Sequence, residues 1–226
     1  MQMSTKYGFA FLCMPKCASS SIEAATRKYC NINFSGFPAL KHINAQLFSD
    51  KILAAHQSLC PSANIESFCL MRDPLQWIES WYRFRARNEL KKQSHPNHIN
   101  YTGNISYNDF IKSYLSKGRK EPYARLGTQY NFLKLSNGEI GIDHIIPMNR
   151  MDLVSEFLSK KIGVLVKIPQ KNVSPVLSIN LDKDLEAKLR QRLSYDIKIY
   201  NFVNFHGKFS KSLHGEELSD LLRDDH

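Results

Sequence analysis

Residues 7–22 read Tyr7-Gly8-Phe9-Ala10-Phe11-Leu12-Cys13-Met14-Pro15-Lys16-Cys17-Ala18-Ser19-Ser20-Ser21-Ile22. The first half of this stretch is short, apolar and rich in aromatic residues, and a proline ends it, which is typical of a buried parallel strand. The three serines that come next offer hydroxyls that can cap a helix. The stretch therefore predicts a strand, a short loop and a helix, in that order.

The same order recurs further along the chain. Residues 67–71, with the apolar run 68–71, predict a second buried strand, and Asp73-Pro74 behind it is a strong helix start. A third buried strand is expected over 142–147, and a helix over 151–162. This alternation predicts an α/β fold with a central, mostly parallel sheet flanked by helices.

We expect a single domain over residues 1–226, with a core over 7–202. The last long helix is expected from about Asp182 to Tyr200. A helix capped by Ser106 is expected to end at Gly118. The polar, basic segment Arg83–Ser106 is interpreted as a lid or acceptor loop, and Lys208–His226 as a mobile tail or a short terminal helix.

Composition places the chain among ordinary globular proteins. Of its 226 residues, 42% are hydrophobic and 23% charged, which excludes disordered and collagen-like classes. No apolar run approaches the ~20 residues that a membrane span needs. The five cysteines are odd in number and form no Cys-x-x-Cys pair, so we expect reduced thiols and a cytoplasmic protein. The formal net charge of +10 indicates an anionic partner or ligand.

The loop between the first strand and its helix has the composition of an anion site. Backbone amides at a helix start lack partners, and Lys16 and the serine hydroxyls add further donors. A phosphate P-loop places glycines before its lysine, whereas here the lysine comes first and glycine is absent, which counts against an ATPase or GTPase. The alternative is a serine-capped helix beside an exposed lysine.

A second candidate anion site lies behind the second strand. Arg72 comes directly after that strand and is expected at its carboxyl end, where open α/β sheets bind ligands. Ser80 lies about two helical turns further on. A guanidinium and a hydroxyl at one edge suit a phosphate monoester. Alternatively, Arg72 pairs with Asp73, and Ser80 packs among tryptophans.

As an ordered pair, these two motifs resemble those of the sulfotransferase family, which uses 3′-phosphoadenosine-5′-phosphosulfate (PAPS). The similarity extends over residues 7–202 and includes Gly127-Thr128-Gln129, which resembles the Ser/Thr-Gln helix of that family. It also includes the late loop Lys171-Asn172-Val173-Ser174. The chain departs from the family pattern at Ala18 and Ser20, where many relatives have Gly or Thr. It departs again at Pro147-Met148-Asn149-Arg150, which replaces the Arg-x-Glu often found after the third strand.

The resemblance implies a single P-loop-like domain and a set of cofactor-binding residues. The first loop would hold the 5′-phosphosulfate, and Arg72 with Ser80 would hold the 3′-phosphate of PAPS or of its product PAP. The full set is Pro15, Lys16, Cys17, Ala18, Ser19, Ser20, Ser21, Arg72, Ser80, Asn172 and Ser174.

The resemblance also implies a mechanism. Lys16 would stabilise charge on the departing phosphate oxygen. Histidine suits proton removal near neutral pH, and His42 is the first candidate base because Lys41-His42 resembles the basic-residue-plus-His element of bacterial members. His56 is the second candidate. We expect no metal site, because His95 and His98 lie in a polar loop without partner carboxylates.

The acceptor is expected to be a hydroxyl compound, a carbohydrate or small metabolite that can be anionic. Its site is expected beside the dense basic segment of Arg83, Arg85, Arg87, Lys91 and Lys92, for which the alternative is a solvated helix end. A P-loop-like nucleotide kinase remains an alternative. A basic nucleic-acid-binding protein is a further one, although no helix-turn-helix, zinc-finger or RNA-recognition signature is present.

Overall fold

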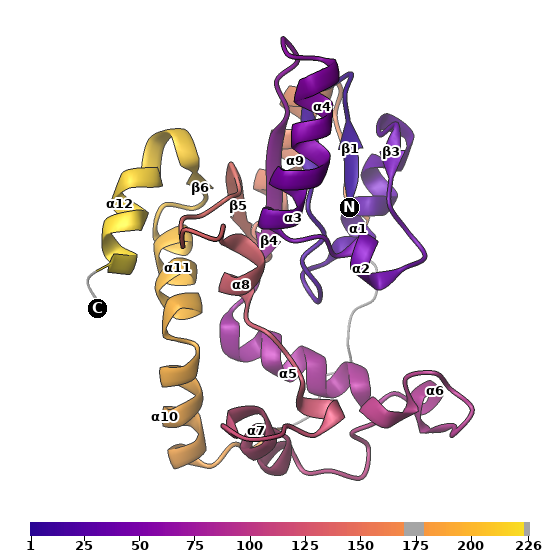
Figure 1. The fold of residues 1–226 in the computed structure, drawn as a ribbon, viewed down its shortest axis with the longest axis vertical. Coiled ribbons are helices and arrows are strands. Elements are labelled where there is room, and N and C mark those ends of the chain that lie inside the picture. Colours follow the sequence, from indigo (N-terminus) through magenta and orange to yellow (C-terminus); the bar gives the residue numbers. More distant parts are fainter. Residues whose placement is uncertain (170–178, 224–226) are drawn as a thin grey trace. The chain divides into compact units, whose positions relative to one another are not determined.

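The structure, a computed structural model, describes residues 1–169 and 179–223. The chain divides into two compact units (Figure 1). Unit 1 holds the described parts of 1–72, 129–172 and 198–226, and unit 2 those of 73–128 and 173–197. The candidate residues Asn172 and Ser174 lie outside the described residues.

Unit 1 is built on a six-stranded sheet with the order β3-β1-β2-β4-β5-β6. The central strands β2, β4 and β5 are parallel, and the outer pairs β3–β1, β1–β2 and β5–β6 are antiparallel. The fold is therefore α/β with a mixed sheet, and the expected parallel arrangement is limited to the centre. The strands are β1 Gln2–Ser4, β2 Phe9–Phe11, β3 Ile32–Asn33, β4 Glu66–Met71, β5 His144–Pro147 and β6 Phe209–Ser210.

Aromatic side chains join the sheet of unit 1 to a covering helix. The ring of Phe68 on β4 lies 5.0 Å from that of Phe11 on β2 and 5.0 Å from that of Phe157. Phe157 belongs to α9 (Met151–Ile162), whose bounds agree with the helix expected from the sequence. Burial of this cluster fixes β2 and β4 side by side, so their carboxyl ends meet at one edge of the sheet.

The crossover between β2 and β4 contains most of the other helices of unit 1. They are α1 Ser19–Thr26, η1 Arg27–Tyr29, α2 Pro38–Lys41, α3 Ala45–Leu47, η2 Phe48–Leu53 and α4 Ala54–Leu59. The short helix α8 (Gln129–Leu133) precedes β5 in the chain. Figure 1 shows α4 at the opposite end of this unit from α2 and α8.

Unit 2 is helical. Its elements are α5 Pro74–Arg85, α6 Asn88–Lys91, η3 His98–Asn100, α7 Tyr107–Leu115, η4 Pro122–Ala124 and α10 Lys183–Arg192. Asp73 caps α5 by accepting a hydrogen bond from the Gln76 amide (3.0 Å), which confirms the predicted helix start. Ser106 caps α7 as expected, but the helix ends at Leu115, before Gly118.

The carboxyl-terminal third differs from the prediction in two places. The single helix expected over 182–200 is broken at Leu193 into α10 and α11 (Ser194–Phe205). Residues 209–223 form β6 and the helix α12 (Lys211–Arg223), which is the terminal-helix alternative. None of the helices in the described ranges is both long enough and apolar enough to cross a bilayer.

Candidate functional site

The loop after β2 has an unusual backbone. Lys16 (φ 66°) and Ala18 (φ 53°) both adopt the left-handed conformation, and within the described residues they are the non-glycine positions with positive φ. This conformation costs an L-residue roughly 1–2 kcal/mol. Such strain persists where the surrounding structure holds it and is concentrated at functional sites. The loop that carries Lys16 is therefore a strained segment that lowers the stability of the fold, as functional sites commonly do.

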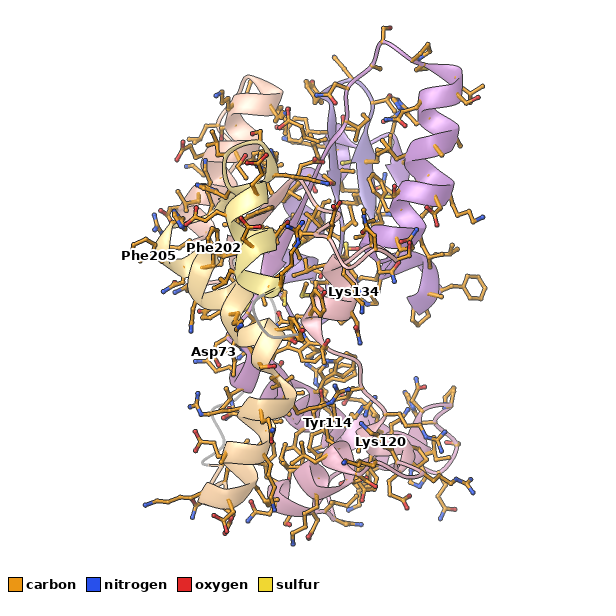
Figure 2. All side chains as sticks on the ribbon, turned by 60° about the vertical axis from the view of Figure 1, so that its left-hand side comes forward. Asp73, Tyr114, Lys120, Lys134, Phe202 and Phe205 are labelled. Carbon is orange, nitrogen blue, oxygen red and sulfur yellow. The ribbon has the colours of Figure 1, made fainter. Side chains whose placement is uncertain are left out.

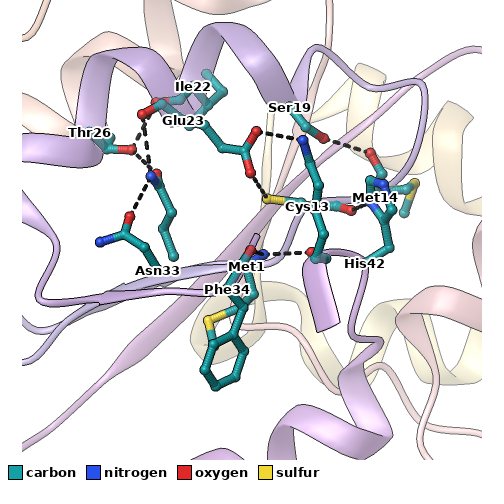
Figure 3. A network of polar contacts seen from close by, with 12 residues as sticks. Met1, Cys13, Met14, Ser19, Ile22, Glu23, Thr26, Asn33, Phe34 and His42 are labelled. Atoms are coloured by element: carbon teal, nitrogen blue, oxygen red, sulfur yellow. Dashed lines mark hydrogen bonds and ion pairs between the residues drawn. The ribbon is translucent and has the colours of Figure 1, made fainter. Parts of the chain in front are cut away.

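The serines hold the loop in a different way from the one predicted. The capping residue of α1 is Ala18, and no side chain caps the helix. The Ser19 hydroxyl instead donates to the Met14 carbonyl (2.9 Å) and closes the loop on itself (Figure 3). Ser19 and Ser21 are buried, whereas Ser20 is half-buried. Ser20 is thus the most exposed of the three residues.

Cys17 connects the loop to the next strand. Its thiol donates to Gln129 Oε1 (3.6 Å) and is fully buried. Burial raises the pKa of this thiol to about 12, while the charges of Arg72 and Lys16 act in the opposite direction. The thiol is therefore protonated at neutral pH, and both cations lie near it. The structure brings Lys16 and Arg72 together at the edge where β2 and β4 end.

Gln129 fixes the backbone that carries Arg72. The Arg72 amide donates to Gln129 Oε1 (3.0 Å), and Gln129 Nε2 donates to the Arg72 carbonyl (2.8 Å). Gln129 has no exposed surface. It thereby ties Arg72 to Cys17, and so to the loop that contains Lys16. The family resemblance points to Thr128-Gln129. The contact between Gln129 and Arg72, which lie 57 residues apart in the chain, was not predicted.

His42 lies at the same edge. It comes directly after α2, and its Nδ1 is 2.6 Å from the Cys13 carbonyl, three residues before Lys16 (Figure 3). A carbonyl oxygen accepts only, so Nδ1 carries the proton and the neutral ring has its lone pair on Nε2. Burial lowers the pKa of His42, opposed by the Cys13 hydrogen bond and assisted by Lys41. The ring is thus held neutral and able to accept a proton.

An ion pair anchors the residue before His42. Lys41 Nζ lies 2.8 Å from a carboxylate oxygen of Glu23 on α1, and both side chains are largely buried. The Cys13 thiol donates to the other Glu23 oxygen (3.6 Å). These contacts connect α2, α1 and the loop after β2, which positions His42 against the loop.

His56 is placed elsewhere in unit 1. It lies on α4, at the end of a crossover that leads back to the amino end of β4. Both ring nitrogens are buried, without a hydrogen-bond partner among the described residues. The structure does not bring His56 to the edge that holds Lys16, Arg72 and His42.

Two sets of predicted residues belong to unit 2. Ser80 is buried on α5 (3% exposed), and its role as a phosphate ligand stays a prediction. The basic segment 83–92 is less available than its composition indicates. Arg83 pairs with Glu79 (3.1 Å). Arg85 is buried and donates to the Tyr123 carbonyl, and burial lowers its pKa to about 10.

Among the described residues, no cluster of three or more His, Cys, Asp or Glu side chains could hold a metal ion. His98 Nδ1 contacts the Leu90 carbonyl, and His95 Nδ1 accepts from the Asn97 amide. All five cysteines are free thiols, as expected.

Comparison of the chain with protein-family models, with curated proteins and with solved structures gave no match. Function is therefore inferred from the residues and the geometry at the carboxyl edge of the sheet.

Proposed function

We propose that this chain is a P-loop-like, PAPS-dependent sulfotransferase that transfers a sulfuryl group to an acceptor hydroxyl. One observation carries the proposal: Lys16 and Arg72 follow the two adjacent parallel strands β2 and β4 at the same edge of the sheet, where the charges of both act on the buried Cys17 thiol. Ligands of open α/β sheets bind at this edge. A nucleotide with phosphates on both its 3′ and 5′ positions supplies two anionic groups for two cations.

Different residues of the site suit the 5′-phosphosulfate and the 3′-phosphate of the ligand. Lys16 and the backbone amides around Ser19 suit the 5′-phosphosulfate, because unpaired amides at a helix start bind anions. Arg72 suits the 3′-phosphate, since a guanidinium binds a phosphate with two parallel hydrogen bonds. Cys17 contributes packing and its backbone rather than its thiol, which stays protonated. Gln129 fixes the position of the Arg72 backbone relative to Cys17.

The reaction needs a base, a leaving-group stabiliser and alignment. PAPS supplies the activated sulfuryl group when bound. His42 Nε2 takes the proton of the acceptor hydroxyl, whose oxygen forms the new bond to sulfur. The bond between sulfur and the phosphate oxygen breaks, its electron pair stays on that oxygen, and Lys16 stabilises the charge. The products are a sulfate ester, PAP and a proton on His42 that passes to solvent. Carbohydrate and small-metabolite hydroxyls both suit this chemistry.

Thermal unfolding with three ligands tests this assignment. We expect stabilisation by PAP, with about 2.7 kcal/mol gained at 100 times its Kd. ATP and duplex DNA should have little effect. Stabilisation by ATP without stabilisation by PAP would instead support a nucleotide kinase, and stabilisation by DNA alone would support a nucleic-acid-binding protein.

A further inference from the structure

A second group of cations gathers in unit 2. Residues 117–125 contain four cations, Lys117, Arg119, Lys120 and Arg125, and one carboxylate, Glu121. Arg192 ends α10, which packs against α7. The chain thus assembles a basic surface from segments about 70 residues apart, which the sequence pattern did not reveal.

The group is organised around one buried ring. Lys120 Nζ lies 4.8 Å from the ring centroid of Tyr114 on α7, and Figure 2 shows the two side chains close together. Tyr114 has no exposed surface, and its hydroxyl donates to the Gly127 carbonyl (3.2 Å). Arg125 Nε donates to the Lys120 carbonyl (3.0 Å), which holds Arg125 beside Lys120.

The charges of Lys120 and Arg192 repel each other. Burial lowers the pKa of Lys120, and the charge of Arg192 lowers it further. Arg192 and the buried Asp196 both act on Tyr114. Within residues 1–169 and 179–223, no carboxylate forms an ion pair with Lys120, Arg125 or Arg192. Like charges held together without a partner gain stability when an anion binds.

We propose that Lys120, Arg125 and Arg192 bind an oxyanion group of an anionic carbohydrate, a sulfate ester or a carboxylate. Guanidinium groups bind such oxyanions through paired hydrogen bonds, and the ammonium adds a third donor. A single-stranded nucleic acid fits less well, because Tyr114 is buried and offers no face on which a base can stack. The inference rests on the proposed function only in identifying the carbohydrate as the acceptor.

Calorimetric titration with a sulfated hexasaccharide in 150 mM salt tests the site. The variant pair K120Q/R192Q removes two charges from it, and K183Q/K188Q removes two exposed charges from the same unit. We expect at least about 10-fold weaker binding for the first pair and less than about 2-fold for the second, since charge-assisted hydrogen bonds are each worth roughly 1.5–3 kcal/mol. R125Q, at an exposed position, is a second variant should the first pair unfold.

Three outcomes would overturn the inference. Equal weakening in both pairs would mean general attraction to a basic surface. Absence of binding by the unchanged protein would remove the site, and tighter binding of single-stranded DNA of equal charge would contradict a carbohydrate ligand. Failure of the proposed function is distinguishable: hexasaccharide binding would then persist, sensitive to K120Q/R192Q, while PAP binding and sulfuryl transfer were absent.

Discussion

The charged side chains at the two edges of the sheet in unit 1 are arranged differently. At the amino edge, Glu66 on β4 accepts from Lys161 (2.5 Å) and lies 2.8 Å from His144 Nε2. Beside it, the Ser67 amide and hydroxyl both donate to Asp143 (2.7 and 2.6 Å). Cations and carboxylates are matched here, and the described residue with positive φ beside Glu66 is a glycine, Gly8, which adopts this conformation without strain.

At the carboxyl edge, the backbone is strained and two cations follow neighbouring strands. Lys16 and Ala18 are left-handed, and Lys16 and Arg72 act on one buried thiol. One edge is thus organised for stability, and the other has the features of an anion-binding site. Matched substitutions at the two edges should therefore separate stability from activity.

Two histidines provide the largest expected difference. His42→Gln should lower turnover by about 1,000-fold, because it removes the proposed general base, and should leave PAP affinity unchanged. His144→Gln, at the amino edge, should retain turnover. Because burial lowers the pKa of His42, the rate of the unchanged protein should fall on acidification only below the ordinary histidine value near 6.5. Turnover by His42→Gln within 10-fold of the unchanged protein would remove His42 as the base.

Two lysines, one at each edge, provide the next contrast. Lys16→Gly should lower turnover by roughly 100-fold, since a leaving-group stabiliser is lost. The same change should raise the melting temperature, because glycine adopts positive φ without strain. Lys161→Met at the amino edge should lower the melting temperature and leave turnover intact. Calorimetry measures the melting temperatures, and initial rates measure turnover. A lower melting temperature for Lys16→Gly would show that the positive φ of Lys16 does not strain the backbone.

Gln129→Leu tests the connection within the carboxyl edge. It leaves the Arg72 amide and carbonyl without these partners and breaks the link to Cys17. We expect PAP affinity to fall by about 10-fold, since each unsatisfied buried group costs roughly 1–3 kcal/mol. The exposed Gln57→Leu is the matched control. Equal PAP affinities in the two variants would mean that Arg72 is positioned without Gln129.

The smallest effect is expected at Glu66. Partial burial alone would raise the pKa of this carboxyl, but hydrogen bonds from Lys161 and His144 outweigh burial and lower the pKa. A depressed pKa stabilises the fold above the ordinary glutamate value, and this stabilisation is lost as pH falls through the lowered value. Glu66→Gln should cost about 1 kcal/mol at pH 7 and nothing at strongly acidic pH. Urea unfolding at several pH values measures it, and a pH-independent loss would exclude ionic pairing as the cause.

The elements that were predicted correctly are those that short stretches of sequence determine. The strand, loop and helix around Lys16, the helix start at Asp73 and the helix α9 are encoded by apolar runs and capping residues. The strands β1, β3 and β6 have only two or three residues, too few to show a periodic pattern. Their antiparallel pairing is what makes the sheet mixed.

Contacts between distant residues were beyond local patterns. The serine run resembled a helix cap, but the helix begins one residue after a left-handed Ala18, and Ser19 bonds backwards to Met14. Arg85 resembled a surface cation, but it is buried and donates to Tyr123. The link between Gln129 and Arg72 depends on how the chain returns after unit 2.

The proposed function depends most on Lys16 and Arg72 binding, together, a nucleotide with phosphates on both its 3′ and 5′ positions. Calorimetric titration of the unchanged protein and of Arg72→Met, with PAP and with adenosine 5′-phosphate, measures this dependence. We expect the unchanged protein to prefer PAP by at least about 100-fold, because a charge-assisted hydrogen-bonded contact is worth roughly 1.5–3 kcal/mol and two act on the 3′-phosphate. Arg72→Met should bind the two nucleotides almost equally. A preference for PAP that survives in Arg72→Met would show that Arg72 does not hold the 3′-phosphate.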